Sequence, residues 1–370
     1  MSGPLRVLQV YPKGDFFTGA AMQLRDLVGG LKGRGHEVVV ATRPSETWSA
    51  KAASLGVPHY PIAMRSDVDV RSAVRLARIV RAHRIQIVHA QKGKARTLAI
   101  MAGLLVRIPV LVLNRGVSFP LDRFNRLGYT TRRVTAIVAV CESIKQGLVR
   151  EGVDAERIAV IYSATDTDRF HPGVDGVPIR RELALGPDDF LITQIGVRSV
   201  KGNDDVLDAM VRVHAQVPGA RLCFVGAPPA RIAQLADKAA ARGLAGVVLP
   251  LGHRDDVPAI LAASDLVVDA SYAGLGLTGS LREALAVETP VIGTALEGVP
   301  ELVVDGETGL LVPPRNPDAL AQAILRVLDN PSRARAMARA GRKRVETQFS
   351  LEGKILRTEA LYRRLLGGDA

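Results

Sequence analysis

Two cations, Arg198 and Lys201, lie three residues apart just after an apolar segment at residues 190–196 that predicts a buried strand. A guanidinium can bind two phosphate oxygens at once, and an ammonium is a compact point charge. The pair therefore suits a diphosphate group held at the carboxyl end of the strand. The alternative is that both side chains are solvated surface charges.

A second predicted strand, at residues 266–269, leads into a loop with three glycines, Gly274, Gly276 and Gly279, and then into a predicted helix. Glycine lets the backbone approach an anion, and the N–H groups at a helix start point toward it. Glu283 falls within the first two turns of this helix. Its carboxylate could accept hydrogen bonds from paired hydroxyls, as on a ribose, or could simply favour the helix dipole.

The N-terminal half holds weaker candidates of the same kind. Gly19 lies in the loop that joins the first predicted strand to the first predicted helix, where it could approach a phosphate or only form a tight turn. His89 ends another predicted strand, and a structural role is the alternative to ligand binding. Arg115 follows a further strand and could bind an acidic group or remain solvated.

These candidates lie on a chain whose apolar segments alternate with amphipathic ones, which predicts strand–helix–strand units with parallel pairing. A turn-rich stretch at residues 166–178 interrupts the alternation. We therefore expect two doubly wound α/β domains that face each other across a cleft at the carboxyl ends of their strands. The expected division is residues 1–170 for the first domain, 171–188 for a linker, 189–345 for the second domain and 346–370 for a final helix.

Length and composition exclude several classes of protein. With 370 residues, of which 47% are hydrophobic, the chain can bury the cores of about two domains. Its apolar runs fall short of the ~20 residues of a membrane span, and its first ten residues are too short and too polar for a signal peptide. Cys141 and Cys223 share no metal-binding spacing, which fits a reducing compartment and predicts a cytoplasmic protein.

The net charge of +12 indicates a polyanionic partner. Residues 71–107 carry nine Lys or Arg and no acid, and residues 121–133 mix arginines with apolar side chains. This composition suits an anionic membrane surface, and a solvated Arg-rich face is the alternative. Nucleic acid is disfavoured because the aromatic interleaving and binding motifs typical of it are missing. The cations expected to face the membrane are Arg71, Arg75, Arg78, Arg123 and Arg126.

The C-terminal half contains a series of segments that are specific in combination, namely Gly252-His253-Arg254-Asp255-Asp256-Val257-Pro258, Ala263-Ser264-Asp265-Leu266, Glu283-Ala284-Leu285-Ala286, Thr289-Pro290-Val291-Ile292, Gly298-Val299-Pro300-Glu301-Leu302-Val303 and Asp305-Gly306-Glu307-Thr308-Gly309-Leu310-Leu311-Val312-Pro313. Together they resemble family 4 retaining glycosyltransferases of the GT-B fold, also called glycosyl transferases group 1. The N-terminal half is compatible, because Gly19-Ala20-Ala21 occupies the place of the family's Gly-Gly-Ala loop. The resemblance covers nearly the whole chain.

This resemblance implies transfer of a sugar from a nucleoside diphosphate sugar with retention at the anomeric carbon, and it implies no metal or other cofactor. Arg198 and Lys201 would then be the catalytic residues that hold the diphosphate, and Glu283 would bind the ribose. The loop of Gly19 would close on the donor from the N-terminal domain. Backbone amides that would contact the phosphate and the sugar belong to Gly274, Gly276, Leu277, Thr278 and Gly279.

The chain departs from the family pattern at two places. The family usually has a Glu, aimed at the donor sugar, eight residues before the one matching Glu283. Leu275 stands there, or Ala273 if the glycines are aligned instead, so this carboxylate is missing. Near the acceptor, Asn114 and Arg115 stand where family members often carry a His. The candidate acceptor-binding residues are therefore His89, Asn114 and Arg115.

Together these features predict a cytoplasmic glycosyltransferase, peripheral on the membrane, that uses a nucleotide-sugar donor and a glycan or glycolipid acceptor. Lipopolysaccharide or another surface polysaccharide would be the product, and the final helix would return to the first domain as in similar proteins. The missing Glu keeps a non-catalytic nucleotide-sugar or lipid-binding protein as an alternative. A nucleotide-sugar 2-epimerase would need acid–base carboxylates, and no convincing pair is present. Two pairs with the DxD spacing of metal-dependent transferases, Asp67–Asp69 and Asp166–Asp168, fall in a helix start and a hinge.

Overall fold

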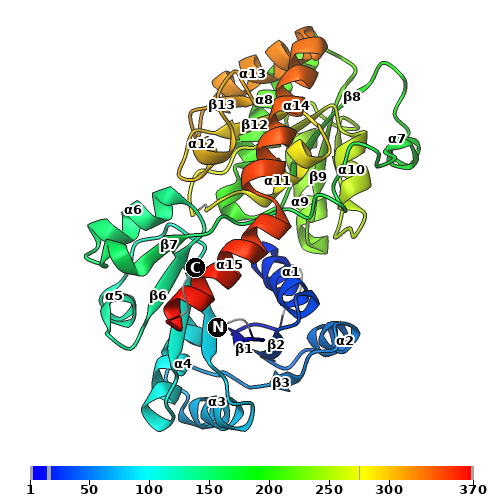
Figure 1. Ribbon diagram of the computed structural model, residues 1–370. Coiled ribbons are helices and arrows are strands. Elements are labelled where there is room, and N and C mark those ends of the chain that lie inside the picture. Colours follow the sequence, from blue (N-terminus) through cyan, green and yellow to red (C-terminus); the bar gives the residue numbers. More distant parts are fainter. Residues whose placement is uncertain (1–2, 15–17, 275, 368–370) are drawn as a thin grey trace. The chain divides into compact units, whose positions relative to one another are not determined.

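The computed structural model describes residues 3–14, 18–274 and 276–367, and the chain divides into two compact units. The first unit combines the chain up to Ser163 with the segment from Leu351 onward, and the second comprises Ala164–Ser350. Each unit is a parallel sheet covered by helices (Figure 1). The predicted α/β class with two doubly wound domains is confirmed.

The first unit holds a seven-stranded sheet in the order β3-β2-β1-β4-β5-β6-β7. The chain leaves β1 toward β2 and later crosses to the other side of β1 to form β4, so the winding reverses between these two strands. Ligands of doubly wound sheets bind at the carboxyl ends of the strands beside such a reversal. The strands are β1 (Arg6–Tyr11), β2 (Glu37–Thr42), β3 (His59–Pro61), β4 (Ile87–Gln91), β5 (Val110–Arg115), β6 (Ala136–Ala139) and β7 (Ile158–Val160).

Helices cover both faces of this sheet, which explains why its central strands are buried along most of their length. The helices are α1 (Gly19–Gly33), α2 (Glu46–Ser54), α3 (Val70–Ala82), α4 (Gly93–Leu105), α5 (Arg123–Thr130), α6 (Glu142–Arg150) and α15 (Leu351–Leu365), with a short 3-10 turn at Ala155–Arg157. α1, α2 and α15 pack on one face, and α3, α4 and α6 pack on the other. Figure 1 shows α15, at the end of the chain, lying beside α1.

Short polar side chains determine where several of these helices begin. Thr18, Ser45, Asp69 and Asp122 each accept a hydrogen bond from a backbone N–H of the helix that follows, which satisfies one of the donors that a helix start leaves unpaired. Asp69 also accepts from the backbone N–H of Arg65 and from Ser72, and these bonds lower the pKa of Asp69 to about 2. The second aspartate of the first DxD pair therefore caps α3.

The second unit holds a six-stranded parallel sheet in the order β10-β9-β8-β11-β12-β13. Its strands are β8 (Phe190–Ile195), β9 (Ala220–Val225), β10 (Val248–Pro250), β11 (Leu266–Asp269), β12 (Val291–Thr294) and β13 (Leu310–Val312). Its helices are α7 (Val177–Glu182), α8 (Asn203–Gln216), α9 (Pro229–Ala240), α10 (Val257–Ala263), α11 (Gly279–Ala286), α12 (Val299–Leu302), α13 (Pro317–Asp329) and α14 (Pro331–Gln348), with a 3-10 turn, η2, at Ser199–Lys201. α8, α9, α13 and α14 contribute to the core on one face of the sheet, and α7 and α10 to the core on the other.

The structure differs from the predicted linker at residues 171–188. This segment belongs to the second unit and contains α7, whose Ile179 is buried against α10. A Cβ atom at Gly176 would lie 2.4 Å from the backbone nitrogen of Ala263, so the chain passes closely over α10. Turn-forming residues mark the approach to a short packed helix here.

Within the described part of the chain, every helix is too short or too polar to cross a lipid bilayer.

Candidate functional site

The candidate site of the second unit lies where β8 and β11 end. These strands are neighbours, with Leu266 paired to Ile192 and Val267 paired to Thr193, so the segments that follow them start side by side. β8 leads to η2, which carries Lys201, and β11 ends at Asp269. The Lys201 ammonium lies 2.6 Å from Oδ2 of Asp269, and Lys201 is only 6% exposed.

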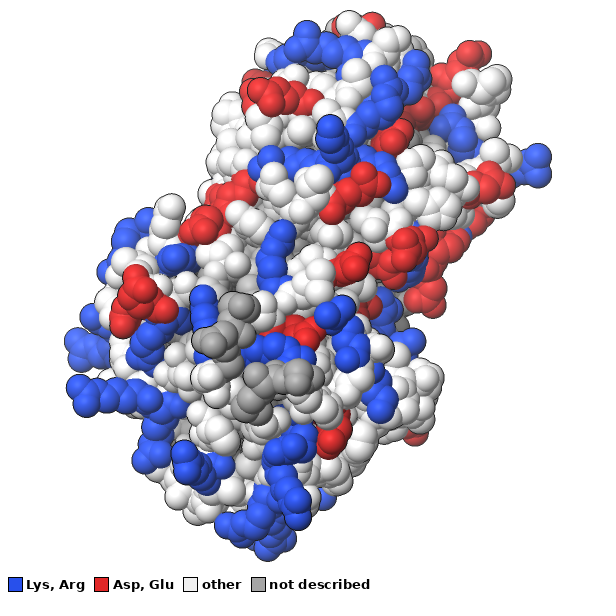
Figure 2. All heavy atoms as spheres, in the orientation of Figure 1, with Lys and Arg blue, Asp and Glu red and all other residues white. Residues whose placement is uncertain are grey.

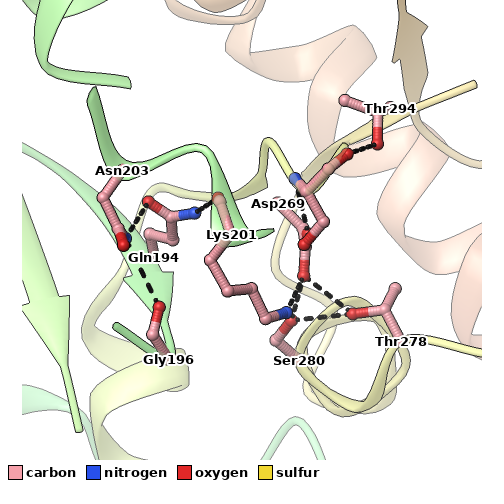
Figure 3. Close-up of polar contacts among 9 residues, drawn as sticks. Gln194, Gly196, Lys201, Asn203, Asp269, Thr278, Ser280 and Thr294 are labelled. Atoms are coloured by element: carbon pink, nitrogen blue, oxygen red, sulfur yellow. Dashed lines mark hydrogen bonds and ion pairs between the residues drawn. The ribbon is translucent and has the colours of Figure 1, made fainter. Parts of the chain in front are cut away.

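Asp269 is the centre of a buried hydrogen-bond network (Figure 3). Its Oδ1 accepts from the backbone N–H of Ser271 at 3.1 Å and from the Ser271 hydroxyl. Its Oδ2 accepts from Lys201, from Thr278 Oγ1 at 2.8 Å and from Ser280 Oγ at 3.1 Å. Burial alone would raise the pKa of Asp269, but the Lys201 charge and these hydrogen bonds together lower it, so the carboxylate is ionised.

A second set of contacts fixes the backbone that carries Lys201. Gln194 donates from Nε2 to the carbonyl of Lys201 at 2.5 Å, and Asn203 donates to Gln194 Oε1 at 3.1 Å (Figure 3). Gly202 has a φ of 63°, and a Cβ atom there would lie 2.1 Å from the carbonyl oxygen of Ala270. Only glycine fits this close approach, which brings the Lys201 turn against the end of β11.

Arg198 has different surroundings from Lys201. It is exposed and lines a hollow of about 260 Å³ beside the start of α8 and one side of α9, and Lys201 is not among the residues lining it. Tyr272 and Arg315 also line this hollow. The Tyr272 hydroxyl donates to the carbonyl of Ser199, and the Arg315 guanidinium lies 4.1 Å from the centre of the Tyr272 ring. Lys201 is buried against Asp269 inside the unit, whereas Arg198 is exposed. The diphosphate role of the two cations stays a prediction.

The glycine-rich loop leads into the start of α11. Gly274 has a φ of 71°, Gly276 and Leu277 are buried, and Leu275 lies outside the described residues. Thr278 is the residue before α11, yet its hydroxyl bonds to Asp269, and among the described residues no side chain caps this helix. Its first N–H groups are therefore open to an anion.

Glu283 stands one turn into α11 and is half-buried. Its Oε1 lies 3.6 Å from the position that a Cβ atom of Gly279 would occupy, so the carboxylate lies beside the start of the helix. The structure therefore brings Thr278, Gly279 and Glu283 together near the Lys201–Asp269 pair. Their binding of a phosphate, a sugar or a ribose stays a prediction.

In the first unit, the buried position of His89 differs from the position expected of an acceptor-binding residue. It lies in β4, is 2% exposed, and its Nδ1 is 2.6 Å from the hydroxyl of Tyr362 on α15. Tyr362 also accepts from Gln9 Nε2, and Gln9 Oε1 accepts from Gln91 Nε2. Burial, with a smaller effect of Lys354, lowers the pKa of His89 to about 3, so the ring is neutral. His89 joins the last helix to the sheet and has almost no exposed surface for a ligand.

The other candidates of the first unit lie at strand and helix ends. Gly19 is the first residue of α1, directly after its cap, Thr18. Asn114 and Arg115 are the last two residues of β5, and both are half-buried. The Arg115 guanidinium donates to the carbonyl of Phe119 and lies 5.7 Å from the ring centre of Tyr129. These contacts leave the predicted roles of Gly19, Asn114 and Arg115 untested.

Asp269 is the residue of this site that sequence reasoning missed. It was assigned only to a strand, although an acidic residue at the end of the apolar run Leu266-Val267-Val268 was a visible clue. A buried carboxylate needs a cation and hydrogen-bond donors, and Lys201 and Thr278 were already candidate site residues. The pairing was not deduced because the partners come from separate loops.

Comparison with known families fits this geometry. A sequence model described as Glycosyltransferase Family 4 matches residues 17–169, and one described as Glycosyl transferases group 1 matches residues 190–330. The two matches divide between the two sheets and together cover most of the chain. This chain belongs to the family 4 glycosyltransferases. The resemblance inferred from the sequence motifs is confirmed at the level of the family.

Individual relatives agree with this assignment. The chain is 33% identical over 243 residues to a D-inositol 3-phosphate glycosyltransferase of Mycobacterium tuberculosis, a match that covers 62% of this chain and 48% of the relative. It thus spans about half the length of the curated relatives that it matches. Among solved structures, a glycosyltransferase from Rickettsia africae superposes with a TM-score of 0.90 at 19% identity, covering 99% of this chain and 100% of that one. The Anabaena protein Alr3699/HepE in complex with UDP-glucose gives 0.85 at 19% identity, covering 96% and 100%. At these identities the likeness establishes the GT-B fold.

Proposed function

We propose that this family 4 glycosyltransferase moves a sugar from a nucleoside diphosphate sugar to a glycan or glycolipid acceptor, with retention and without a metal ion. The observation that carries the proposal is the buried Lys201–Asp269 pair at the ends of β8 and β11, beside the uncapped start of α11. The second unit would hold the donor, and the first unit would hold the acceptor. The Anabaena relative was solved with UDP-glucose, which makes this sugar nucleotide the first donor to test.

The charges of the site suit the departure of a nucleoside diphosphate. An ammonium has three N–H donors, and Asp269 is the one hydrogen-bond partner of Lys201 Nζ among the described residues. Two donors therefore remain for phosphate oxygens, and the pair with Asp269 holds them in place. Negative charge grows on the distal phosphate as the sugar leaves, and fixed donors stabilise this charge most in the transition state. The open N–H groups of α11 would add to this effect, while Glu283 would accept from ribose hydroxyls.

The family assignment predicts donor-dependent activity that can be measured directly. We expect release of a nucleoside diphosphate from one sugar nucleotide in a panel of UDP-, GDP- and ADP-sugars when membrane extract supplies the acceptor. Arg198→Ala should lower this turnover, whereas the control Arg212→Ala, which breaks a surface ion pair with Asp318, should not. Binding without turnover across the whole panel would contradict the proposal and would favour a non-catalytic protein.

The acceptor side of the proposal rests on an exposed surface of the first unit. α5 presents Phe124 at 86% and Leu127 at 68% exposure, flanked by Arg123 and Arg126. Figure 2 shows Lys and Arg gathered over this unit with few acids between them on the face drawn. Apolar side chains among cations suit the surface of an anionic bilayer, with about 1 kcal/mol of attraction for each cation near it. We propose that the enzyme is peripheral on a membrane, where it would meet a glycolipid such as a lipopolysaccharide precursor. The exposed arginines of α3 that would assist are Arg71, Arg75 and Arg78.

Vesicle binding tests this surface. We expect the protein to sediment with vesicles that contain anionic phospholipid and to remain in solution with zwitterionic vesicles. The double variant Phe124→Ser, Leu127→Ser should reduce the bound fraction severalfold, because it removes the apolar contact but keeps the charges. Leu356→Ser, at another exposed apolar position of the same unit, is the matched control. Equal binding of the double variant and the control variant would refute the proposed surface.

A further inference from the structure

The start of α4 lacks the capping side chain with which several other helices of the first unit begin. α4 begins at Gly93, directly after the carboxyl end of β4, and no side chain caps it among the described residues. Its first turn carries no acid, whereas Asp69 and Asp122 cap α3 and α5. The preceding residue, Lys92, has a φ of 74°, a strained conformation for a residue with a Cβ atom. The backbone N–H groups of the first turn are thus available to a ligand.

A second, independent observation also indicates an anion: the guanidinium of Arg96 is buried and only partly hydrogen-bonded. Arg96 is 5% exposed, and its Nη2 donates to Asn125 Oδ1 at 2.6 Å. Its Nε and Nη1 are buried and have no hydrogen-bond partner among the described residues. Leaving part of a buried cation unpaired is unfavourable, so the surroundings are incomplete without a negative group. Nη2 lies 3.9 Å from the position of a Cβ atom on Gly93 at the start of α4, and Nε lies 2.5 Å from that of a Cβ atom on Gly128 in α5, so the guanidinium lies between these two helices.

Neighbouring groups increase the positive charge at this point. The Arg96 guanidinium lies 4.9 Å from the ring centre of Tyr129, and Arg115 lies 5.7 Å from the same ring centre. Gln91 of β4 is paired with Asn114 of β5, so the end of β4, which leads into α4, is adjacent to the end of β5, which carries Arg115. Lys94 belongs to the first turn of α4, and its ammonium donates to the carbonyl of Arg65.

Among the described residues, the acid Asp122 lies close to this cluster. Asp122 bonds to the backbone N–H and the side-chain amide of Asn125, and it is close enough for Arg96 to contribute to the lowering of its pKa. Because its hydrogen bonds go to Asn125, it leaves Nε and Nη1 of Arg96 without a partner. The cluster of Lys94, Arg96 and Arg115 keeps an excess of positive charge.

We infer that the start of α4 and Arg96 form a binding site for a phosphate group of the acceptor. The N–H groups of the first turn would bind terminal phosphate oxygens, and Arg96 would supply the charge-assisted bonds. This inference deepens the proposed function and rests on it only for the statement that the phosphate belongs to the acceptor. A phosphorylated sugar and a lipid phosphate monoester offer the same group. Binding can be measured without any donor.

Titration calorimetry on the full chain provides the test. Glycerol 3-phosphate should bind and glycerol, which lacks the phosphate, should not. Arg96→Gln should weaken binding at least tenfold, and Lys94→Ala should weaken it severalfold. Arg81→Ala, an exposed cation in the last turn of α3, is the control and should bind like the unaltered chain.

The possible results distinguish phosphate binding at the start of α4 from the proposed sugar transfer. Because Arg96 is buried, Lys94→Ala keeps the test valid if Arg96→Gln fails to fold. Vesicles with phosphatidic acid provide the lipid arm, and binding in either arm that depends on Lys94 or Arg96 supports the site and identifies the source of its phosphate. No binding in both arms, or equal binding by all variants, would overturn the inference. Phosphate binding without sugar transfer would leave this site standing and would contradict only the proposed function.

Discussion

Lys201→Met should abolish most of the sugar transfer and also destabilise the second unit. The variant removes the ammonium that we propose to bind the departing phosphate, and loss of one donor that stabilises a transition state lowers turnover by about 10²–10³-fold. It also leaves the buried Asp269 carboxylate without its cation, for which a fall of about 3–5 kcal/mol in the free energy of unfolding is expected. Nucleoside diphosphate release and denaturant unfolding measure the two effects separately.

A double variant distinguishes the two causes. In Lys201→Met with Asp269→Asn the uncompensated charge is removed, so stability should recover in part while turnover stays low. If Lys201→Met were as stable as the unaltered chain, the ion pair would have no structural role. If the single variant kept normal turnover, Lys201 would not hold the diphosphate.

The Lys201–Asp269 pair also predicts the direction in which stability changes with pH. In the unaltered chain the pKa of Asp269 is lower in the folded than in the unfolded state, so its ionisation stabilises the fold above the unfolded value of about 3.9. This contribution is lost as the pH falls through the lower, folded pKa. In Lys201→Met burial dominates and the pKa rises, so the stability difference between the two proteins should shrink as the solution is acidified.

Gly202→Ala should disrupt the same site by a steric route. Its Cβ atom would lie 2.1 Å from the carbonyl oxygen of Ala270, so the turn that carries Lys201 must move away from β11. Gly243→Ala is a matched control, because Gly243 has a φ of 73° and no atom within 4 Å of the new Cβ. Both variants incur the strain of a positive φ, about 1–2 kcal/mol.

The difference between these two variants isolates the contact with Ala270. We expect Gly202→Ala to lose at least about 2 kcal/mol more than Gly243→Ala, which is in the range of an overpacked core, and to lose most of its turnover. Thermal unfolding of the two proteins under one condition, together with the transferase assay, provides the comparison. Equal stability and activity would mean that the turn and β11 are not in close contact.

Much of the architecture was predictable because its causes are local. The segments 190–196 and 266–269 were identified as strands from their apolar residues, and each overlaps an observed strand. β3 and α2 were missed, since a three-residue edge strand and a helix with few buried side chains produce little periodicity. α7 was taken for a linker because its hydrophobic contacts come from α10, which lies far away in the sequence.

The sequence by itself determined the family, the alternation of strands and helices, and the strand ends at which charged and glycine-rich segments gather. These properties follow from local patterns of side chains along the chain. Only the tertiary structure decided which of those side chains meet. Lys201 and Asp269 are 68 residues apart and His89 and Tyr362 are 273 apart, yet each pair is buried and in contact. Burial removes water as the alternative partner, so the state of a charged or polar group depends on whichever group the fold places beside it.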